Sequence, residues 1–378
     1  MKLLHLSDLH LGKRVNEFSM LEDQEYILTK IINIIDEEKP EGILIAGDIY
    51  DKTIPSVEAV QLFDNFLTRI ANRDIKICVS SGNHDSAERI AFGAQLMNSR
   101  GVHMSPVFRG DIEPIVLSDE FGEANIYMLP FVKPAHVRHV FPDASIESYD
   151  DAVKVVVSDM NMDPSKRNVL VAHQFITGAE RSESEDISIG GLDNIDASAF
   201  FDFDYVALGH IHKPQTVGKE NIRYCGTPLK YSFSEANHKK SVTVVELNEK
   251  GALCVRLLPL FPKRDMREIK GTYAEITARD NYKDTDTNDY MHITLTDEDD
   301  IPDAIGKLRS IYPNIMKIDY DNNRTRSNQS VNGADRVDEK TPLELFEEFY
   351  LLQNNVEMNE EQRTFSAELI EKIWGTQK

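Results

Sequence analysis

The chain has little cysteine and no long apolar run, and each absence narrows the kind of protein it can be. Its three cysteines, Cys78, Cys225 and Cys254, lack the spacing of a disulfide framework or of a thiolate metal site. No apolar stretch approaches the ~18 residues of a membrane-spanning helix. The opening MKLLHLSDLH has Asp8 where a secretory signal peptide needs an apolar core. We therefore expect a cytoplasmic protein with reduced thiols and no membrane association.

Positive charge is also scarce. Lysine and arginine number 42 against 64 aspartate and glutamate residues, which gives a net charge of -22. General binding to nucleic acid depends on lysine and arginine against the phosphates, so this balance argues against it. A local basic patch stays open, and carboxylates that hold metal cations would make the formal charge misleading.

The length of 378 residues, with 41% hydrophobic and 28% charged residues, is typical of a soluble globular protein of two or three domains. Its first part alternates apolar strands with amphipathic helices. Helices are predicted over 21–38 and after the capping residue Ser56, and strands over 2–7, 42–47, 75–81, 168–173 and 205–210. Strands separated by helices pair in parallel, which predicts an α/β fold.

The remainder divides into three further segments. From residue 223 the chain reads as β structure without helices, and we place the end of the first domain, 1–262, after it. Residues 263–322 predict a small α+β domain, and residues 323–340, almost without apolar side chains, predict a linker. The tail, 341–378, returns to helical spacing, with an apolar stripe of Leu343, Phe346, Phe349, Tyr350, Phe365, Leu369, Ile373 and Trp374.

Side chains that can bind metal follow five of the predicted strands, at the point where each strand ends. They are Asp8 and His10, then Asp48, Asn83 and His173, and last His210 and His212. The carboxyl ends of strands in an α/β sheet face one crevice, so these side chains should meet there. Residues two apart in an extended chain point to the same side, which would align Asp8 with His10, and His210 with His212.

Oxygen and nitrogen donors without a thiolate suit Mn²⁺, Fe or Zn²⁺ better than Ca²⁺ or a structural zinc. Seven such ligands are too many for one tetrahedral ion and suit two ions that share a carboxylate. Two ions ~3.5–4 Å apart can clamp the attacking and leaving oxygens of a phosphoryl group. Each residue taken singly also fits an ordinary turn, loop or core position. The recurrence after five strands favours the metal site.

The motifs DLH (8–10), GDIYD (47–51), GNHD (82–85), AHQ (172–174) and GHIH (209–212) resemble those of the calcineurin-like metallophosphoesterases. The stretches DLHLGK, LEDQ and GTPLKYSFSE, the second domain and the tail resemble one branch, nuclease subunits that work with an ATPase. This resemblance implies a four-layer sandwich, two β-sheets flanked by helices, with a small α+β cap domain and C-terminal helices. It implies an ATP-dependent nuclease of DNA repair, recombination and replication. Such an enzyme digests double-strand ends and cuts single strands or hairpins.

The resemblance also implies the roles of individual residues. One divalent ion would be held by Asp8, His10, Asp48 and His212, and the other by Asp48, Asn83, His173 and His210. Mn²⁺ is the expected metal, with Mg²⁺ as an alternative. His84 would sit over the phosphate as an acid, oriented by Asp85. Archaeal and eukaryotic relatives have a second histidine where this chain has Asp51, so no role of that histidine carries over.

The residues alone leave the substrate open. A phosphatase or phosphodiesterase acting on a small phosphoester would show the same ligands, and a non-catalytic subunit with a structural metal site is a third reading. The extra domain and tail favour the nuclease. The histidine in NHD argues against a structural site, because His84 is not needed to hold an ion. Lys13, Arg14 and Arg89 are candidate DNA contacts or ordinary surface charges.

Two regions are candidates for protein partners. The resemblance implies a homodimer through helices near 57–70 and 86–98. Their apolar side chains either form that interface or bury against the chain's own sheet: Phe63, Phe66, Phe92, Leu96 and Met97. The tail, 341–378, would bind the coiled coil of the ATPase subunit or pack on this protein's own body.

Overall fold

A computed structural model describes residues 1–185, 194–299, 301–322, 341–354 and 357–374. The predicted linker, 323–340, lies outside the described residues. Two compact units make up the chain, the first of Met1–Glu268, Asp286–His292 and Arg309–Lys317, the second of Ile269–Thr285, Ile293–Leu308 and Ile318–Lys378. Each unit consists of several separate segments of the chain, so the domain boundaries expected from the sequence stay a prediction.

The first sheet of unit one has the strand order β14-β13-β1-β4-β5-β6. Its parallel strands are β1 (Lys2–Leu6), β4 (Gly42–Ala46), β5 (Lys76–Ser80) and β6 (Val102–Met104). β13 (Ser241–Leu247) and β14 (Leu253–Pro259) extend it antiparallel beyond β1. The predicted strands and helices of this region are confirmed. α1 (Leu21–Glu38) follows β1 after the hairpin β2 (Arg14–Val15) and β3 (Phe18–Ser19), and α2 (Val57–Ala71) follows β4. Ser56 caps α2 by accepting the N–H of Ala59.

The second sheet has the order β11-β12-β10-β9-β8-β7. The predicted strands at 168–173 and 205–210 are β9 (Arg167–His173) and β10 (Tyr205–Gly209), paired in parallel. Parallel β8 (Gly122–Leu129) and β12 (Lys219–Tyr224) flank them, and β7 (Ile115–Asp119) and β11 (Gln215–Val217) form antiparallel edges. Between β8 and β9 lie α5 (Pro134–Val140) and α6 (Tyr149–Asp159), and the 3-10 turn η2 (Ala197–Phe200) precedes β10.

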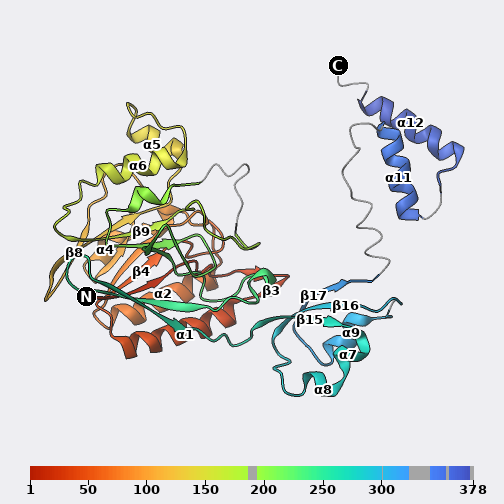
Figure 1. The fold of residues 1–378 in the computed structure, drawn as a ribbon, viewed down its shortest axis with the longest axis horizontal. Helices are drawn as coiled ribbons and strands as arrows, with labels where there is room; N and C mark the ends of the chain where they lie inside the picture. The colour runs from red at the N-terminus through yellow and green to blue at the C-terminus, as the bar shows by residue number, and fades with distance from the viewer. Residues whose placement is uncertain (186–193, 300, 323–340, 355–356, 375–378) are drawn as a thin grey trace. The chain divides into compact units, whose positions relative to one another are not determined.

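Three apolar cores hold these layers together. Alternate residues of β1 and β4 point to opposite faces: Leu3 and Leu44 pack against the second sheet, whereas Leu4 joins the core shared with α1 and α2. On the far side, the second sheet packs against α5, α6 and η2. The layers are therefore helices, sheet, sheet and helices, as the resemblance implied (Figure 1).

Shorter elements complete unit one. α3 (Ala87–Ile90) and α4 (Ala94–Asn98) follow β5, and the 3-10 turn η3 (Phe233–Glu235) lies in the segment that the sequence predicted to be β structure without helices. Phe63 and Phe66 are buried in the core beneath α2, and Met97 packs against that core. Phe92 and Leu96 are exposed, at 84% and 81% of their surface. Of the five apolar side chains considered for a dimer interface, only Phe92 and Leu96 are therefore largely exposed.

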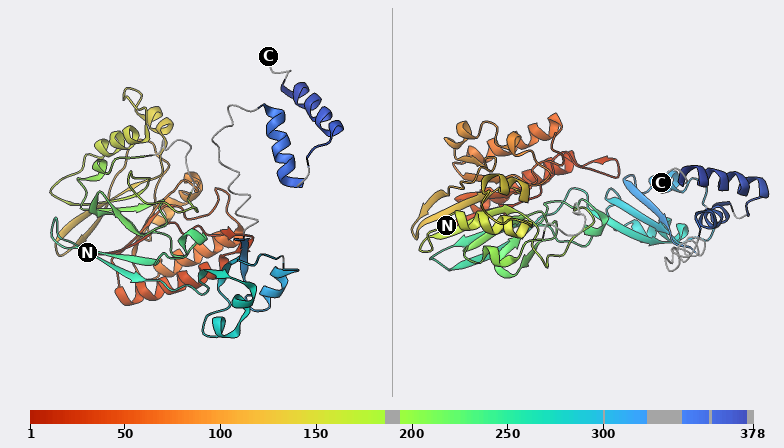
Figure 2. Two further views of the ribbon diagram at one scale, coloured as in Figure 1. Left: turned by 45° about the vertical axis from the view of Figure 1, so that its right-hand side comes forward. Right: turned by 90° about the horizontal axis from the view of Figure 1, so that it is seen from above.

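A third sheet, of order β15-β16-β17, consists of β15 (Met266–Gly271), β16 (Tyr290–Leu295) and β17 (Ile315–Tyr320) (Figure 2). Short helices accompany it: α7 (Tyr273–Thr277), α8 (Arg279–Tyr282) and α9 (Ala304–Arg309). The tail forms α11 (Pro342–Asn354) and α12 (Glu360–Trp374), which pair through Arg363 with Glu347 and through Gln362 with Tyr350. None of the described helices is long and apolar enough to cross a membrane.

Candidate metal centre

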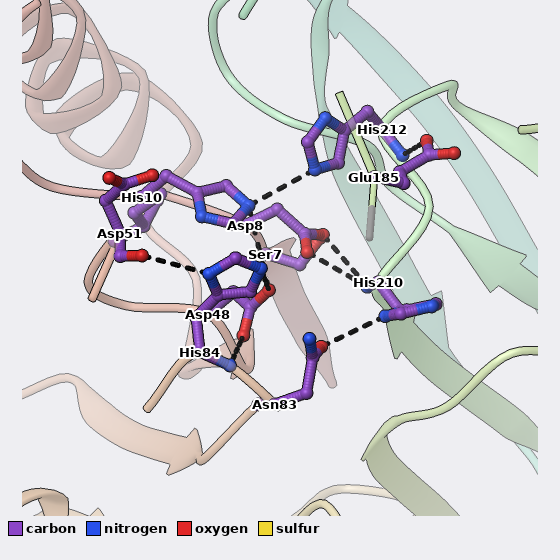
Figure 3. A network of polar contacts seen from close by, with 12 residues as sticks. Ser7, Asp8, His10, Asp48, Asp51, Asn83, His84, Glu185, His210 and His212 are labelled. Atoms are coloured by element: carbon purple, nitrogen blue, oxygen red, sulfur yellow. Dashed lines mark hydrogen bonds and ion pairs between the residues drawn. The ribbon is translucent and has the colours of Figure 1, made fainter. Parts of the chain in front are cut away.

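The candidate ligands converge from the strand ends of both sheets (Figure 3). Asp8 and His10 follow β1, Asp48 follows β4 and Asn83 follows β5, all in the first sheet. His173 ends β9 and lies opposite Gly209, the last residue of β10, in the second sheet. At this point the sheets approach so closely that a Cβ on Gly209 would lie 1.8 Å from the carbonyl oxygen of Ala46. The glycine that opens GHIH is therefore required by packing between the sheets.

Several of these residues have an unusual backbone. Asp8, His10, Asp48 and His210 lie in the left-handed region, with φ of 53°, 43°, 50° and 98°. The extended geometry that the sequence suggested for the two His-containing pairs is therefore wrong, although Asp8 and His10 do lie in one group of donors. Left-handed non-glycine residues cost about 1–3 kcal/mol each and persist where surrounding contacts fix them. Here backbone bonds tie the loops together: Asp8 N–H donates to the Gly47 carbonyl and His10 N–H to the Asp48 carbonyl, both at 3.0 Å.

One group of donors gathers around His10. Its Nε2 lies 3.2 Å from Nε2 of His212 and 3.6 Å from Oδ2 of Asp48. Asp8 belongs to the same group, and its carboxylate accepts the backbone N–H of His210 at 2.9 Å. Six of the seven candidate ligands are buried, with at most 7% of their surface exposed. The exception is Asn83, which belongs to the second group.

A second group surrounds Asn83. The Oδ1 atom of Asn83 lies 2.9 Å from Nε2 of His173 and 3.1 Å from Nδ1 of His210. Oδ2 of Asp48 is 3.3 Å from the same His173 nitrogen, so this carboxylate reaches both groups. The structure thus brings all the predicted ligands together and places His210 and His212 in different groups, with Asp48 between them.

These distances fit metal binding. Two nitrogen or oxygen ligands bound at ~2.0–2.2 Å to one ion lie about 3.0–3.4 Å apart. Three donor separations, of 3.1 to 3.3 Å, lie in this range, and two others, of 2.9 and 3.6 Å, lie close to it. His10 and His212 also point ring nitrogens at each other, an arrangement that a shared cation stabilises and that two lone pairs disfavour. In addition, Nδ1 of His10 and Nε2 of His210 are buried without a hydrogen-bond partner among the described residues.

The charges favour a cation as well. Burial raises the pKa of Asp8. Burial alone would also raise the pKa of Asp48, but the imidazoles of His173 and His10 outweigh burial and hold this pKa well below its usual range. Burial would lower the pKa of His173, yet Asp48 and Asp8 raise it to about 9. The carboxylates therefore attract positive charge, and a divalent ion would compete with the proton on His173.

His84 lies at the edge of this cluster, with 19% of its side chain exposed. Its Nδ1 is 2.9 Å from the carbonyl oxygen of Asp51, so Nδ1–H donates to that oxygen and Nε2 is the other nitrogen. Nε2 lies 4.0 Å from Oδ2 of Asp48, and the backbone N–H of His84 donates to Oδ1 of Asp48 at 3.0 Å. The Asp51 backbone, rather than its side chain, therefore positions the imidazole.

Asp85 was expected to orient His84, and the structure gives its carboxylate a different task. Oδ2 accepts the backbone N–H groups of Gly82 at 2.9 Å and Ile49 at 3.1 Å, and Oδ1 accepts that of Tyr50 at 3.1 Å. Asp85 is buried, and burial together with Asp48 raises its pKa to about 6. It thus joins the loop after β5 to the loop after β4, and its orientation of His84 stays a prediction.

The candidate DNA contacts differ in availability. Lys13 forms an ion pair with Asp51, Nζ to Oδ1 at 2.8 Å, and each side chain is only 15% exposed. Lys13 is therefore already paired with a carboxylate, and its contact with DNA stays a prediction. Arg14 and Arg89 are exposed, and Arg14 donates to the carbonyl oxygen of Glu17.

Sequence reasoning missed the side chains that hold the ligands from behind. Ser7 donates to Asp8, and Nδ1 of His173 lies 2.9 Å from the carbonyl oxygen of Ala46. Ser184 and Glu235 both contact His212. The stretch GTPLKYSFSE was noted only as part of the resemblance, and its polar residues carried no signal of the contact with His212.

Clustered carboxylates and imidazoles at the strand ends of a two-sheet sandwich are the arrangement of a metallophosphoesterase. Residues 1–214 match the family described as calcineurin-like phosphoesterase, and residues 262–354 match the type 5 capsule protein repressor C-terminal domain. The chain is 34% identical over 354 residues to the SbcD subunit of the nuclease SbcCD from Staphylococcus epidermidis, with 92% of each chain covered. It belongs to the calcineurin-like phosphoesterases and, within them, to the SbcD nuclease subunits, which confirms the resemblance seen in the motifs.

Among solved structures, a dimetal phosphatase from Danio rerio is similar, with a TM-score of 0.39 and 9% sequence identity. The similarity covers 68% of this chain and 95% of that one.

Proposed function

We propose that this chain is a two-metal nuclease subunit that hydrolyses DNA phosphodiester bonds. It would work as an exonuclease at double-strand ends, dependent on ATP and the ATPase SbcC, and as an endonuclease on single strands or hairpins. The observation that carries the proposal is Asp48, whose carboxylate lies 3.6 Å from His10 Nε2 and 3.3 Å from His173 Nε2. One carboxylate between two donor groups is the arrangement that a pair of ions requires.

The first ion would be held by Asp8, His10, Asp48 and His212, and the second by Asp48, Asn83, His173 and His210. Their oxygen and nitrogen donors suit Mn²⁺, and Mg²⁺ is the alternative. When bound, the two ions would supply positive charge to the phosphate and lower the pKa of a coordinated water.

The chain's own residues then act on the substrate. The buried carboxylates and imidazoles would hold the ions to which the reacting phosphate binds. His84 presents Nε2 toward the centre because Nδ1 is held by the Asp51 carbonyl oxygen. We assign to the imidazolium form of His84, protonated on both nitrogens, the transfer of the Nε2 proton to the departing sugar oxygen, which is typically worth ~10²–10⁴-fold in rate. Asp85 fixes the loops that carry His84 and Asp48.

A cavity of about 450 Å³ supports a substrate larger than a simple phosphoester. Its wall includes Ser184, which contacts His212, and Tyr231, whose ring centroid is 5.7 Å from that of His10. Phe233 and His292 lie on the same wall, with ring centroids 5.2 Å apart. Aromatic side chains beside a phosphate site suit the stacking of nucleobases from a single strand.

Two assays test the proposal. Hydrolysis of bis-p-nitrophenyl phosphate with Mn²⁺ should exceed hydrolysis of p-nitrophenyl phosphate, because a nuclease cleaves diesters. Preference for the monoester would favour a phosphatase, and no hydrolysis of either would indicate a structural metal site. A phosphodiesterase acting on a small phosphoester would cleave the diester but not DNA. Defined DNA ends, with and without SbcC and ATP, then separate the exonuclease from the endonuclease.

Two partner surfaces belong to the proposal. Phe92 and Leu96 are exposed beside α3 and α4, and we assign them to contact with a second copy of this chain. The tail carries exposed Phe346, Phe349 and Phe365, which we assign to the coiled coil of SbcC as a helix-in-groove contact. The side chains of Ile373 and Trp374, part of the same predicted stripe, lie outside the described residues. We place the protein in the cytoplasm, where SbcC and DNA would be available.

A further inference from the structure

The stretch GTPLKYSFSE (226–235) supplies none of the proposed metal ligands, yet it wraps around the His212 side of the centre. Gly226 has φ of 75°, and a Cβ on it would lie 2.6 Å from the carbonyl oxygen of His212. The hydroxyl of Tyr231 donates to the Leu9 carbonyl oxygen at 2.6 Å, and its ring lies against His10. The loop therefore packs against the backbone at two proposed ligands, His10 and His212.

The hydrogen bonds of the His212 ring determine which of its nitrogens carries the proton. Nδ1 lies 2.7 Å from the hydroxyl of Ser184 and 3.3 Å from Oε1 of Glu235. The Ser184 hydroxyl donates its only proton to the same Glu235 oxygen, at 2.5 Å. An ionised carboxylate only accepts, so Nδ1 of His212 must be the donor. Nε2 then presents a lone pair, and it is the nitrogen that faces His10.

Glu235 is kept ionised by a buried lysine. The residue is fully buried, and its Oε2 lies 2.5 Å from Nζ of Lys240, whose side chain is 3% exposed. The other two Lys240 protons go to Oγ1 of Thr227 at 2.6 Å and to the carbonyl oxygen of His212 at 2.8 Å. Every proton of the ammonium group is therefore used, and one of them reaches His212 directly.

The backbone of His212 is held from the opposite side. Its N–H donates to Oε1 of Glu185 at 2.7 Å, and Oε2 of Glu185 accepts the N–H of Ser182 at 2.6 Å. His212 is thus fixed at its backbone nitrogen, its backbone oxygen and Nδ1. Only Nε2 is directed to the centre.

We propose that Glu235, acting through Ser184 and anchored by Lys240, is a positioning residue that fixes the tautomer and ring orientation of His212 for metal binding. The inference rests on the proposed function, in which His212 is a ligand. Outer partners of ligating histidines typically contribute ~10–100-fold to metal affinity. A polar network of this kind holds its members in place when every donor and acceptor is satisfied.

The first test titrates Mn²⁺ alone into the full-length, metal-free chain by isothermal calorimetry. Ser184→Ala removes the hydroxyl between His212 and Glu235 and leaves the ion pair intact. It should weaken one of two Mn²⁺ sites by ~10-fold or more and leave the other unchanged. Ser158→Ala is the control, because Ser158 is exposed on α6 in the outer helix layer and should leave both sites at wild-type affinity.

Glu235 needs a paired variant. Glu235→Gln alone leaves the charge of Lys240 buried without its partner and could unfold the chain. Glu235→Gln combined with Lys240→Met removes both charges together, and circular dichroism verifies the fold. The double variant should weaken the same Mn²⁺ site as Ser184→Ala, by ~10–100-fold.

The second test reads the tautomer directly. Spectra of ¹⁵N-histidine in the metal-free wild type should show His212 as the Nδ1–H form, with the signal assigned by its loss in His212→Gln among the 11 histidines. Ser184→Ala and the double variant should convert it to a mixture of tautomers. A merely structural loop would change stability without changing this signal.

Wild-type Mn²⁺ affinities and an unchanged His212 tautomer in both variants would overturn the positioning role and leave the proposed function standing. A wild-type chain that binds no Mn²⁺ would instead overturn the proposed function, and this inference with it. The two failures are distinct because the first appears only in the variants.

Discussion

Replacing Gly82 with alanine tests whether the centre is as rigid as its packing indicates. Gly82 opens the GNHD motif after β5, and a Cβ at this position would lie 2.1 Å from Oδ1 and 2.5 Å from the backbone nitrogen of Asp48. Ordinary contact begins near 3.4 Å. Rotation of the Asp48 side chain cannot relieve the contact with its backbone, so one of the two loops must move by about 1 Å.

A movement of this size exceeds the ~0.5 Å tolerance of a catalytic arrangement. Misplacement by ~1 Å typically costs about 10²-fold in rate, so we expect at least that loss of Mn²⁺-dependent diester hydrolysis. Overpacking costs about 1–3 kcal/mol of stability. At ~2–4 °C per kcal/mol, the melting temperature should fall by roughly 2–12 °C.

The assays are hydrolysis of bis-p-nitrophenyl phosphate, calorimetric Mn²⁺ titration and thermal unfolding. Gly271→Ala is the matched control: Gly271 lies in β15 of the third sheet, follows none of the strands that carry the ligands, and its Cβ would meet first the Glu275 carboxylate, at 3.1 Å. It should keep wild-type turnover and both Mn²⁺ sites. Normal turnover, metal binding and melting temperature in Gly82→Ala would refute the argument, because the loops could then move without a loss of activity or stability.

Four other predictions follow from the assignments. Asp48→Ala should lose both ions and at least ~10³-fold of hydrolysis, well beyond the effect of an outer partner; metal analysis that still finds two ions would exclude the shared carboxylate. His84→Gln should keep both metals and lose ~10²–10⁴-fold of turnover, the scale of a missing general acid; loss of metal would make it a ligand. Phe92→Ser with Leu96→Ser should give a monomer by light scattering with diester hydrolysis intact, whereas an unchanged dimer would place the interface elsewhere. A chain ending at Lys340 should fold, keep endonuclease activity and fail to copurify with SbcC; undiminished binding would move that interface away from the tail.

The convergence of the candidate ligands could be predicted from the sequence because each of them follows an apolar strand that local pattern reveals. The distribution over two sheets could not, since β1, β4, β9 and β10 show the same buried pattern. Only long-range pairing, through β13 next to β1 and β8 next to β9, separates them. The family resemblance supplied the two-sheet arrangement that periodicity alone leaves open.

Side-chain partners were predicted less well than positions. The partner of Lys13 is 38 residues away, and Asp85 bonds to a loop 35 and 36 residues earlier. Such pairings depend on how two loops pack, which no local pattern encodes. The apolar stripe of α2 is consistent with the observed burial of Phe63 and Phe66. α3 and α4 are too short for periodicity to predict whether Phe92 and Leu96 are buried or exposed.

The pair Asp8 with His10 shows a correct prediction, that the two side chains lie together, reached through incorrect geometry. An extended chain would have aligned them, yet Asp8, His10 and His210 adopt left-handed backbone that few side chains favour. Such conformations are maintained by bonds from neighbouring loops, including His210 N–H to the Asp8 carboxylate at 2.9 Å. Local preference and final structure therefore disagree most where the ligands lie. A disagreement of this kind is expected where a site, rather than the fold, dictates the backbone.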